Sequence, residues 1–413
     1  MKLLYLTQYY PPEVGAGAVR SNIMSRYLAH DGWEVDVVCE KPNYPTGKVD
    51  ASYREKWAYK DHEAENLTVH RIWSVANPRK NVVQQLLFFL SFMVSSFFYV
   101  LSNPKNYDII YVTSPPIFAG VTGYALSKIF GSKFVFEVRD IWPDSAVNQT
   151  ELEGEPVFLR YGRKLENWLY HNADLIVPVT HAAEAIIRER SNGTPTSVIP
   201  NGVDIDLFEK KANPRDGMDE PYDSTKFRVG YVGSLGVIHD LRTFVEAAKR
   251  CEDDPGIRFV IVGDGGRNNQ LRDILDEIQP RNLDWVGLKK HEQVPYYISS
   301  FDVAVNPINP SKAFESIVTV KFYEYLACEV PVITCGRGLM KEIGDLSGAA
   351  ITVEPKSPEK LAEEVRILKK SQIKINKLSG SGRRFVSTKY SRKLLATNLS
   401  SELKKQFTKT ANL

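Results

Sequence analysis

The sequence has little of what marks a disulfide-rich, zinc-binding or nucleic-acid-binding protein. Only four of its 413 residues are cysteines (Cys39, Cys251, Cys328 and Cys335), and no two of them form a C-x-x-C pair. Scattered cysteines argue against a disulfide framework or a zinc knuckle and suggest a reducing compartment. No charge of one sign dominates either, because 53 Lys and Arg residues stand against 50 Asp and Glu residues, a net charge of +3. That balance argues against a chain-wide basic field for nucleic acid.

The sequence also lacks a secretory signal, a repeat of short fixed period and a low-complexity tract. The apolar stretch 1–7 is too short for a signal peptide, and Tyr-Tyr-Pro-Pro at 9–12 follows it in place of a small-residue cleavage site. We therefore expect a cytoplasmic protein that opens with a buried strand. The charged fraction of 25% and the apolar fraction of 43% are those of a folded globular chain, which excludes a disordered one.

What the sequence does have is an alternation of short β-branched or aromatic runs with stretches of helical periodicity. The apolar runs begin with 2–7 and 34–39, and they start again after a polar stretch with 227–232 and 259–262. Continuous apolar strands with helices between them indicate parallel sheets that are covered on both faces. We predict an α/β chain of two doubly wound domains that meet near 199–206.

A glycine-bearing loop follows the first predicted strand and leads into a helix. It holds Gly15 and Gly17, and Arg20 lies in the first turn of the helix behind it. Small residues let the backbone approach a ligand, and a helix N-terminus presents free N–H groups to an anion. The third glycine of the dinucleotide fingerprint is missing, so the pattern is weak as an NAD site. A phosphate site and a plain strand-to-helix turn both remain open.

Two more glycine loops follow successive strands of the second predicted domain. Gly233 and Ser234 come after one strand, and Gly263, Asp264 and Gly265 come after the next. Since the carboxyl ends of parallel strands meet at one edge of a sheet, a ligand at that edge would meet both loops. Each loop alone would be an ordinary turn, but together they favour a phosphate or nucleotide site.

Two charged pairs stand where a site of this kind would need them. Arg139 and Asp140 end the strand 134–138, a position where charge is costly unless it binds or pairs. They form either a structural pair or a guanidinium and a carboxylate that line a cleft. Lys321 and Glu324 lie three residues apart, which places them on one face of a short helix. They hold a diphosphate and a ribose diol, or else they form a surface ion pair.

Taken in chain order, these motifs resemble the family-4 glycosyltransferases, whose fold is GT-B. The resemblance covers nearly the whole chain, and I-P-N-G-V-D at 199–204, in front of the second domain, is its most specific piece. N-Y-P at 43–45 and the apolar run 82–101 fit the branch with fucosaminyltransferase-like and colanic-acid-type polysaccharide enzymes more closely. The other matching segments are 10–20, 139–143, 229–236, 262–265, 321–327 and 331–333.

The resemblance implies two Rossmann-like domains that face each other across a cleft. Residues 1–200, completed by a C-terminal helix at 384–413, would present the acceptor, and residues 201–383 would bind a nucleotide-sugar donor, with UDP expected. The reaction would be retaining transfer to a lipid-linked or polysaccharide acceptor, with no metal, no other cofactor and no nucleic acid. A UDP-sugar 2-epimerase of the same fold and a non-catalytic nucleotide-sugar-binding protein are the alternatives.

The resemblance also implies roles for individual residues. Glu324 matches the glutamate on the ribose, Lys321 matches a basic residue on the diphosphate, and Asp140 matches a polar or catalytic residue at a strand end. The candidate catalytic set is Asp140, Arg139 and Lys321. The candidate donor-binding set is Gly15, Gly17, Arg20, Gly233, Ser234, Gly263, Asp264, Gly265, Glu315, Ser316, Lys321 and Glu324. No metal ligand is expected, because the formal D-x-D at 204–206 belongs to the joint motif.

The sequence departs from the family pattern where the donor phosphates are expected. Many members carry an arginine and a lysine after the first glycine of the second domain, and this chain has Ser234 and His239 there. A diphosphate leaving group needs positive charge, so another cation would have to supply it. The candidates are Lys321, Arg267, Lys289 and Lys290.

A second departure concerns the family's paired glutamates, which are spaced as E-x7-E. Ser316 stands eight residues before Glu324, and Glu315 is one place off. Either Glu315 is realigned by a loop shift or Ser316 replaces the first glutamate. Recognition of the donor sugar's hydroxyl groups depends on which of the two applies.

One apolar run, 82–101, is unusual in a chain of this composition. Its length could just span a bilayer, but two glutamines and three serines interrupt it, and a span would split the first sheet. A buried helix of the α/β layer is one interpretation. The other is a partly exposed apolar helix that docks on the inner face of the plasma membrane, with Arg79, Lys80 and Lys105 at its ends.

Overall fold

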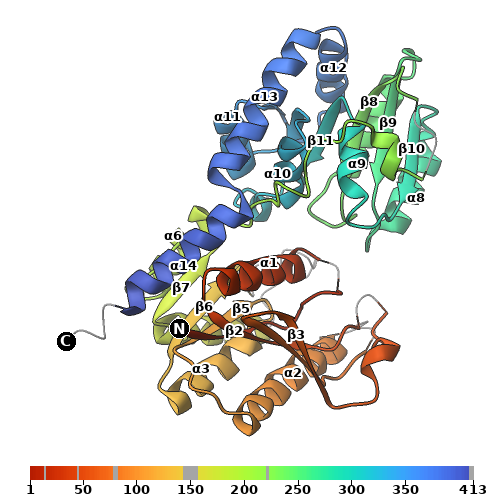
Figure 1. Cartoon of the computed structure of the whole chain (residues 1–413). Coiled ribbons are helices and arrows are strands. Elements are labelled where there is room, and N and C mark those ends of the chain that lie inside the picture. Colours follow the sequence, from red (N-terminus) through yellow and green to blue (C-terminus); the bar gives the residue numbers. More distant parts are fainter. Residues whose placement is uncertain (14, 44–45, 78–81, 143–156, 220–222, 409–413) are drawn as a thin grey trace. The chain divides into compact units, whose positions relative to one another are not determined.

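The chain folds into two compact units, as its computed structural model shows. The described residues are 1–13, 15–43, 46–77, 82–142, 157–219 and 223–408. Met1–Asn201 and Lys393–Leu413 form the first unit, and Gly202–Arg392 form the second (Figure 1). Each unit holds one sheet with helices on both faces, which confirms the predicted α/β class.

The first unit is built on a seven-stranded sheet with the order β3-β4-β2-β1-β5-β6-β7. Neighbouring strands pair in parallel, except that β3 and β4 are antiparallel. The switch point lies between β1 and β5, and open α/β sheets bind ligands outside the carboxyl ends at such a point. The strands are β1 (Lys2–Leu6), β2 (Glu34–Glu40), β3 (Ala58–Ala64), β4 (Leu67–Ile72), β5 (Ile109–Ser114), β6 (Lys133–Val138) and β7 (Leu175–Pro178).

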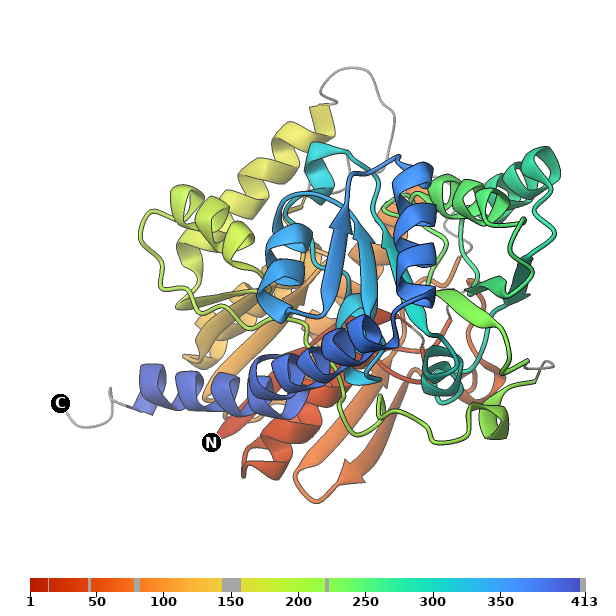
Figure 2. The ribbon, with the colours of Figure 1, turned by 90° about the horizontal axis from the view of Figure 1, so that it is seen from above.

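Helices cover both faces of this first sheet. On one face, Leu28 and Leu399 belong to a buried cluster that joins α1 (Ala16–His30) and α14 (Arg392–Thr408) to the strands. Figure 2 shows α14 running alongside α1. A separate cluster buries the other face. That face carries α2 (Val82–Ser102), α3 (Phe118–Phe130), α5 (Val157–Asn172) and α6 (His181–Arg190).

The second unit has a six-stranded, all-parallel sheet with the order β10-β9-β8-β11-β12-β13, and its switch point lies between β8 and β11. The strands are β8 (Phe227–Val232), β9 (Ile257–Val262), β10 (Leu283–Gly287), β11 (Val303–Pro307), β12 (Val332–Cys335) and β13 (Ala350–Val353). One face carries α7 (Leu241–Arg250), α8 (Asn268–Ile278) and α12 (Pro358–Lys369). The other carries α9 (Val294–Ser299), α10 (Val320–Ala327), α11 (Leu339–Ser347) and α13 (Gln372–Lys389).

The borders between the units differ from the predicted ones. The linker border falls at 201/202, next to the predicted 200/201, but the C-terminal border falls at 392/393, later than the predicted 383/384. The reason is that Phe385 and Val386 of α13 lie in the core of the second unit, and Tyr390 stacks on Tyr323 with ring centroids 4.6 Å apart. The predicted C-terminal helix is therefore two helices, and only α14 packs on the first sheet.

Strand β3 was not expected from the sequence. It reads A-Y-K-D-H-E-A, a polar alternation with little apolar surface, and its residues are half-buried or exposed. It forms through antiparallel pairing with β4, from Ala58 opposite Ile72 to Ala64 opposite Leu67. An edge strand of this kind buries few apolar side chains, so hydrophobic patterning alone does not predict it.

The apolar run at 82–101 forms the single helix α2, which has two different faces. Phe88 and Phe92 are buried against the sheet, whereas Val83, Leu87 and Phe98 are 67%, 53% and 59% exposed. By length and composition alone this helix could cross a membrane, with a mean hydropathy of 1.8 over Val83–Ser102, of which 28% is buried. The buried-helix interpretation thus holds for one face, and the other face is apolar and open.

A buried polar network fastens the end of α2 to the sheet. The Asp36 carboxylate of β2 accepts hydrogen bonds from Lys105 (2.6 Å), from Nε2 of His70 (2.9 Å) and from the Tyr107 hydroxyl (3.1 Å). Nδ1 of His70 in turn bonds the hydroxyl of Tyr99 in α2 (2.8 Å). Burial alone would raise the pKa of Asp36, but its hydrogen bonds with His70 and Lys105 lower it to about 2.

We expect the Asp36→Asn variant to lose a pH-dependent part of the stability. A carboxyl whose pKa is lowered by folding stabilises the protein above its unfolded pKa, near 4, and that contribution disappears as the pH falls toward 2. With a folded pKa of about 2, the contribution is about 2 kcal/mol. Urea unfolding should show the variant less stable than the wild type at pH 7, with a smaller gap at pH 3. A gap of equal size at both pH values, or an equal loss in the exposed control Glu65→Gln, would contradict this account.

Candidate functional site

The carboxyl edge of the first sheet brings the first glycine loop against Arg139. Gly15, with φ of 148°, precedes α1, and Gly17 lies in its first turn. A Cβ on Gly17 would overlap with the Arg139 guanidinium, so the two groups are in contact. Arg139 donates from Nε to the Ser114 carbonyl (3.2 Å) and from Nη2 to the Pro115 carbonyl (2.8 Å). These two bonds at the end of β5 hold the guanidinium over the start of the helix.

Asp140 follows Arg139 at the end of β6 and is exposed. The Arg139 side chain is committed to two backbone carbonyls, so the structural pair between Arg139 and Asp140 is not the arrangement found here. Asp140 is exposed as a residue, yet burial of its carboxyl raises the pKa, and the positive charge of Arg139 opposes that rise. Through its two hydrogen bonds and its contact with Gly17, the Arg139 guanidinium reaches the switch point between β1 and β5, where a ligand of this sheet would bind, and Asp140 follows at the neighbouring strand end.

Arg20, in contrast, lies in the interior of the first unit. Its side chain is 2% exposed, and its Nε and Nη2 donate to the Glu137 carboxylate (3.0 and 2.9 Å). Nη1 and Nη2 also donate to the carbonyls of Pro200 (2.6 Å) and Ile199 (2.9 Å). Burial opposes both charges, yet the pKa of Glu137 is lowered because Arg20 lies beside it. Arg20 thus connects α1 and β6 to the linker. This geometry favours a structural role for Arg20 and not the donor contact expected from the sequence.

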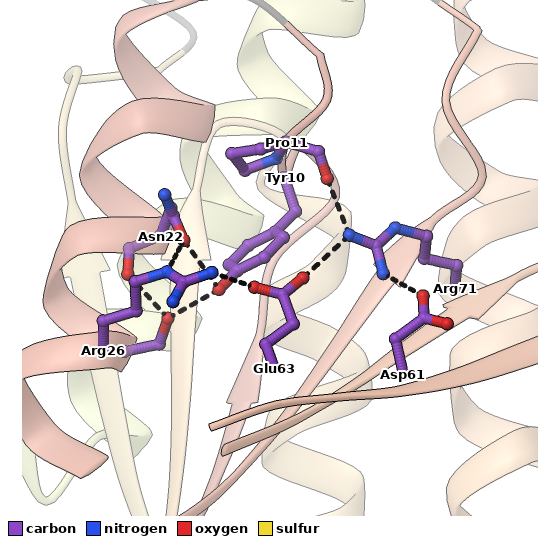
Figure 3. A network of polar contacts seen from close by, with 8 residues as sticks. Tyr10, Pro11, Asn22, Arg26, Asp61, Glu63 and Arg71 are labelled. Atoms are coloured by element: carbon purple, nitrogen blue, oxygen red, sulfur yellow. Dashed lines mark hydrogen bonds and ion pairs between the residues drawn. The ribbon is translucent and has the colours of Figure 1, made fainter. Parts of the chain in front are cut away.

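The loop before Gly15 is held by a polar network that the sequence did not reveal (Figure 3). The buried Arg71 of β4 donates from Nη2 to the Pro11 carbonyl (2.8 Å) and to Glu63 (3.1 Å), and from Nη1 to Asp61 (2.5 Å). Glu63 also accepts from Arg26 of α1 (2.5 Å). The β3–β4 hairpin thus joins the loop and helix α1 through charged side chains that point toward one another.

In the second unit, the backbones of the two predicted glycine loops are in direct contact. The N–H of Gly233 donates to the Val262 carbonyl (2.9 Å), and the N–H of Leu235 donates to the Asp264 carbonyl (3.1 Å). A Cβ on Gly263, whose φ is 141°, would overlap with the Gly233 carbonyl, and a Cβ on Gly265 would lie 2.5 Å from the Leu235 carbonyl. The loops after β8 and β9 therefore form one joined surface at the carboxyl edge, as predicted from their positions in the sequence.

Lys321 reaches this surface from the first turn of α10. It is 8% exposed, and its Nζ donates to the Tyr231 hydroxyl (2.6 Å) and contacts Nε2 of His239 (2.9 Å). Nζ also lies so close to Gly233 that a Cβ there would be 2.5 Å away. The Tyr231 hydroxyl donates to the Ser234 carbonyl (2.7 Å). Lysine, histidine and tyrosine thus form a cluster behind the glycine loop.

Burial determines the charge of this cluster. It lowers the pKa of Lys321 to about 7, and the negative charge of Glu324 offsets only part of that effect. Burial and the neighbouring Lys321 lower the pKa of His239 well below its usual range. At neutral pH the imidazole is therefore uncharged, and the lysine is close to its midpoint.

Of the four cations proposed to replace the family's clamp, Lys321 is the one in contact with the glycine loop. The Arg267 guanidinium turns to Gln270 (2.9 Å), although the Arg267 N–H donates to the Leu235 carbonyl (3.1 Å). Lys289 lies 3.3 Å from the Asp219 carboxylate and over the Tyr297 ring. Lys290 is exposed.

The positions that correspond to the family's paired glutamates differ in burial. Glu315 is exposed, and its carbonyl accepts from the N–H of Leu339 (2.7 Å), while Ser316 is half-buried. Glu324 is half-buried on α10, where burial raises the pKa of its carboxyl and the positive charge of Arg392 opposes the rise. The surface ion pair between Lys321 and Glu324 is not the arrangement found, because the lysine bonds to Tyr231 and His239.

Two hollows of the second unit are lined by described residues and bear on where a donor would bind. One, of about 400 Å³, opens beside the glycine loop, between α7 and α8, and is lined in part by Gly236, His239, Arg267 and Lys356. The other, of about 850 Å³, lies near the amino ends of β8, β9 and β10, where Arg228, Arg258 and Trp285 are among its lining residues. The second hollow is remote from the carboxyl edge, so its size does not make it the donor site.

The described part of the chain offers no group of three or more His, Cys, Asp or Glu side chains placed to hold a metal ion. The formal D-x-D at 204–206 caps a turn, since Oδ1 of Asp204 accepts from the N–H groups of Asp206 and Leu207, at 3.2 Å each. Its first carboxylate is thus engaged with the backbone.

Comparison with known families places both units in one group of enzymes. Residues 19–207 match the model of Glycosyltransferase Family 4, and residues 226–370 match that of Glycosyl transferases group 1. The chain is 26% identical over 380 residues to WcaI of Escherichia coli K12, described as a colanic acid biosynthesis glycosyl transferase, covering 89% of this chain and 91% of that protein. It is 22% identical over 297 residues to the glycosyltransferase WbjE of Pseudomonas aeruginosa, covering 70% of this chain and 72% of that one.

Solved structures share the fold over almost the whole chain. Sucrose-phosphate synthase of Thermosynechococcus elongatus superposes with a TM-score of 0.75 at 18% identity, covering 98% of this chain and 99% of that one. HepE of Anabaena, solved in complex with UDP-glucose, superposes with a TM-score of 0.70 at 17% identity, covering 98% of this chain and all of that one. At these identities the likeness establishes the fold, which is GT-B.

We expect the Gly263→Ala variant to destabilise the second unit, because its Cβ would overlap with the Gly233 carbonyl at a backbone angle that side chains rarely adopt. The expected loss is at least about 2 kcal/mol in chemical denaturation. Gly266→Ala is the matched control, since Gly266 belongs to the same loop and a Cβ there would meet nothing within 4 Å. Equal stabilities of the two variants would show that the loops are not pressed together.

Proposed function

This chain belongs to the family-4 glycosyltransferases, and from that premise we propose that it transfers a sugar, with retention, from a UDP-sugar to a lipid-linked or polysaccharide acceptor. The observation that carries the proposal is the Lys321–His239–Tyr231 cluster behind the joined glycine loops. The UDP-glucose complex of HepE supports UDP as the nucleotide. The colanic acid role in WcaI's description supports a cell-surface glycan as the product.

The second unit holds the donor in this proposal. The glycine loops let the diphosphate approach the backbone, and the first turn of α10 and the Lys321 ammonium face the charge that develops as the diphosphate leaves. Glu324, one turn further along the same helix, accepts hydrogen bonds from the ribose diol. Ser234 and either Glu315 or Ser316 contribute the remaining polar contacts to the donor.

The first unit presents the acceptor. Arg139, fixed by two carbonyls over Gly17, orients the reacting groups, and the exposed Asp140 carboxylate lies beside it. The bond between the anomeric carbon and the diphosphate oxygen breaks, and the bond to the acceptor oxygen forms on the face that the diphosphate leaves, so the configuration is retained. Asp140 takes the proton that the acceptor hydroxyl gives up. These assignments make Asp140, Arg139 and Lys321 the catalytic set.

The acceptor is proposed to be a lipid because helix α2 carries an exposed apolar face. Its exposed aliphatic and aromatic side chains are spaced by about one or two helical turns, so they lie along one side of the helix. The same layer adds exposed residues on α3 and α5. An apolar face of this extent is unusual on a monomer in water, and it fits a membrane surface. The residues are Val83, Leu86, Leu87, Val94, Phe98, Ile129, Tyr161 and Trp168.

The charges around this face indicate which membrane it meets. Lys128 lies over the Tyr124 ring and Lys164 over the Tyr161 ring. Lys105, which follows the end of α2, is instead paired with Asp36, and Arg79 and Lys80 lie outside the described residues. Lysines next to an apolar stripe attract anionic lipid headgroups. The protein is therefore proposed to be cytoplasmic and peripheral on the inner face of the plasma membrane.

We expect purified protein to transfer sugar from one member of a UDP-sugar panel to a membrane lipid extract. Asp140→Asn should lower kcat at least about a hundredfold by removing the base. Glu324→Ala should raise KM for the donor about tenfold by removing hydrogen bonds to the ribose. The exposed Glu65→Gln serves as the control and should behave as the wild type. Unchanged transfer rates in both the Asp140 and the Glu324 variant would show that these residues do not form the site.

The same assay separates the other functions that this fold allows. Incubation with the donor alone, followed by analysis of the sugar, would reveal a 2-epimerase by an epimerised product. Donor binding without turnover across the whole acceptor panel would identify a non-catalytic binding protein. Either result would overturn the transfer function proposed here.

We expect exchange of the exposed apolar side chains of α2 to abolish membrane binding without unfolding the protein. A Val83→Ser, Leu87→Ser, Phe98→Ser triple variant should stay in the supernatant when sedimented with phosphatidylglycerol-containing vesicles, whereas the wild type should pellet. Ile373→Ser is the control, because Ile373 is equally apolar and 84% exposed in the second unit. Equal binding of the triple variant and the wild type, checked for folding by circular dichroism, would contradict membrane docking.

The proposed reaction assigns no step to a metal ion, because a lysine and a helix start supply the positive charge. We expect EDTA to leave the transfer rate unchanged. A loss of activity that magnesium restores would contradict this expectation.

A further inference from the structure

Lys321 is a buried amine whose hydrogen-bond and ring contacts on the described elements are to neutral groups. Its Nζ meets the Tyr231 hydroxyl at 2.6 Å and Nε2 of His239 at 2.9 Å, and it lies over the Tyr231 ring at 4.1 Å from the centroid. A charged amine taken out of water is poorly stabilised by such partners. None of these contacts brings a negative charge to the amine, although the Tyr231 ring face favours a cation to some extent.

The other ionisable groups around the cluster do not supply the missing negative charge. Tyr231 comes from β8, and burial keeps its pKa well above the usual range, so it stays neutral. Glu324 is on α10 itself, and its carboxyl is also drawn to Arg392. The Tyr325 hydroxyl is engaged with the backbone of Val232, to whose carbonyl it donates (3.1 Å). On the described elements around Lys321, the one carboxylate that acts on it is a turn away.

A dianionic group beside the glycine loop would change this balance. Gly233 carries no side chain, and Nζ of Lys321 lies directly behind it, at the place where a Cβ would be 2.5 Å away. A phosphate group that lies against the Gly233 backbone would therefore be close to this amine. A diphosphate there would stabilise the charged form of the lysine and leave His239, which accepts from it, neutral.

We propose that binding of the donor diphosphate brings a proton from solution onto the Lys321 amine, so that the site acquires its full positive charge only together with its ligand. This inference rests on the proposed function, since the ligand is a nucleotide diphosphate. The amine gains one proton and its nitrogen keeps its bonds to carbon. Without ligand, the folded protein therefore does not have to bury a fully charged lysine that lacks a negatively charged partner.

The sign of the pH dependence follows from this uptake. Below pH 7 the lysine already carries its proton, because its pKa without ligand is about 7. Above pH 7 the proton has to be taken up on binding, so the affinity falls as the pH rises, by up to about tenfold per pH unit. The fall continues until the pH reaches the pKa of the amine in the complex.

Calorimetry with UDP between pH 7.0 and 9.0 tests the proposal. The second ionisation of a phosphate lies near pH 6, so the charge of UDP changes little in this range and the protein causes the pH dependence. Titrations in two buffers with different ionisation enthalpies give the number of protons taken up. We expect about half a proton at pH 7 and close to one at pH 8.5.

Two variants show which group takes the proton. Lys321→Arg carries a permanent charge and should bind UDP without proton uptake and with a flat pH profile. His239→Gln keeps an acceptor for the lysine and should retain the uptake. If the arginine does not fit behind Gly233, as thermal unfolding would show, Lys321→Met serves instead and should bind UDP weakly at every pH.

The outcomes distinguish this inference from the proposed function. UDP binding by the wild type with no proton uptake and a flat pH profile would overturn the inference alone. Loss of the uptake in His239→Gln with retention in Lys321→Arg would also overturn it, because the imidazole would then be the group protonated. Failure of the wild type to bind UDP at all would overturn the donor assignment on which the inference rests.

Discussion

The contact between the two glycine loops of the second unit is the constraint on which its site depends. The loops after β8 and β9 lie so close that a Cβ on Gly263 would overlap with the carbonyl of Gly233. Because no side chain stands on Gly233, the Lys321 amine can lie directly behind it. The same arrangement holds Tyr231 on the Ser234 carbonyl and His239 on the lysine. A bulky residue at either glycine would separate the loops and displace the cation.

The first unit places charge at its switch point in a different way. Arg139 is fixed by backbone carbonyls and stays at the edge, whereas Arg20 is drawn inside by Glu137 and by the carbonyls of the linker. Two arginines close to the same loop thus lie in different places, Arg139 at the carboxyl edge of the sheet and Arg20 in the interior of the unit. The difference follows from partners: a buried guanidinium is tolerable only where carboxylate and carbonyl oxygens take up its hydrogen-bond donors.

Helix α2 packs on the first sheet with one face and exposes apolar side chains on the other. Phe88 and Phe92 fill the layer between the helix and the first sheet, and the Asp36 network fastens its C-terminal end. The opposite face needs no such partners within the unit and stays apolar. An interfacial role and a structural role are therefore compatible in one helix, and polar substitutions separate them only at exposed positions such as Leu87.

The sequence by itself determined the α/β class and the position of most strands, because buried parallel strands are continuous apolar runs. It also determined the glycine loops, because glycine after a strand indicates a turn whose backbone angles other residues rarely adopt. It also limited the replacement cation to four residues. Only the tertiary structure decided that Lys321 lies against the glycine loop, that Arg20 is internal and that the C-terminal border lies after α13. These depend on which side chains meet across elements far apart in the chain. The residue pattern of one segment does not show which distant segments it contacts. A polar strand such as β3, for example, forms only because it pairs with β4.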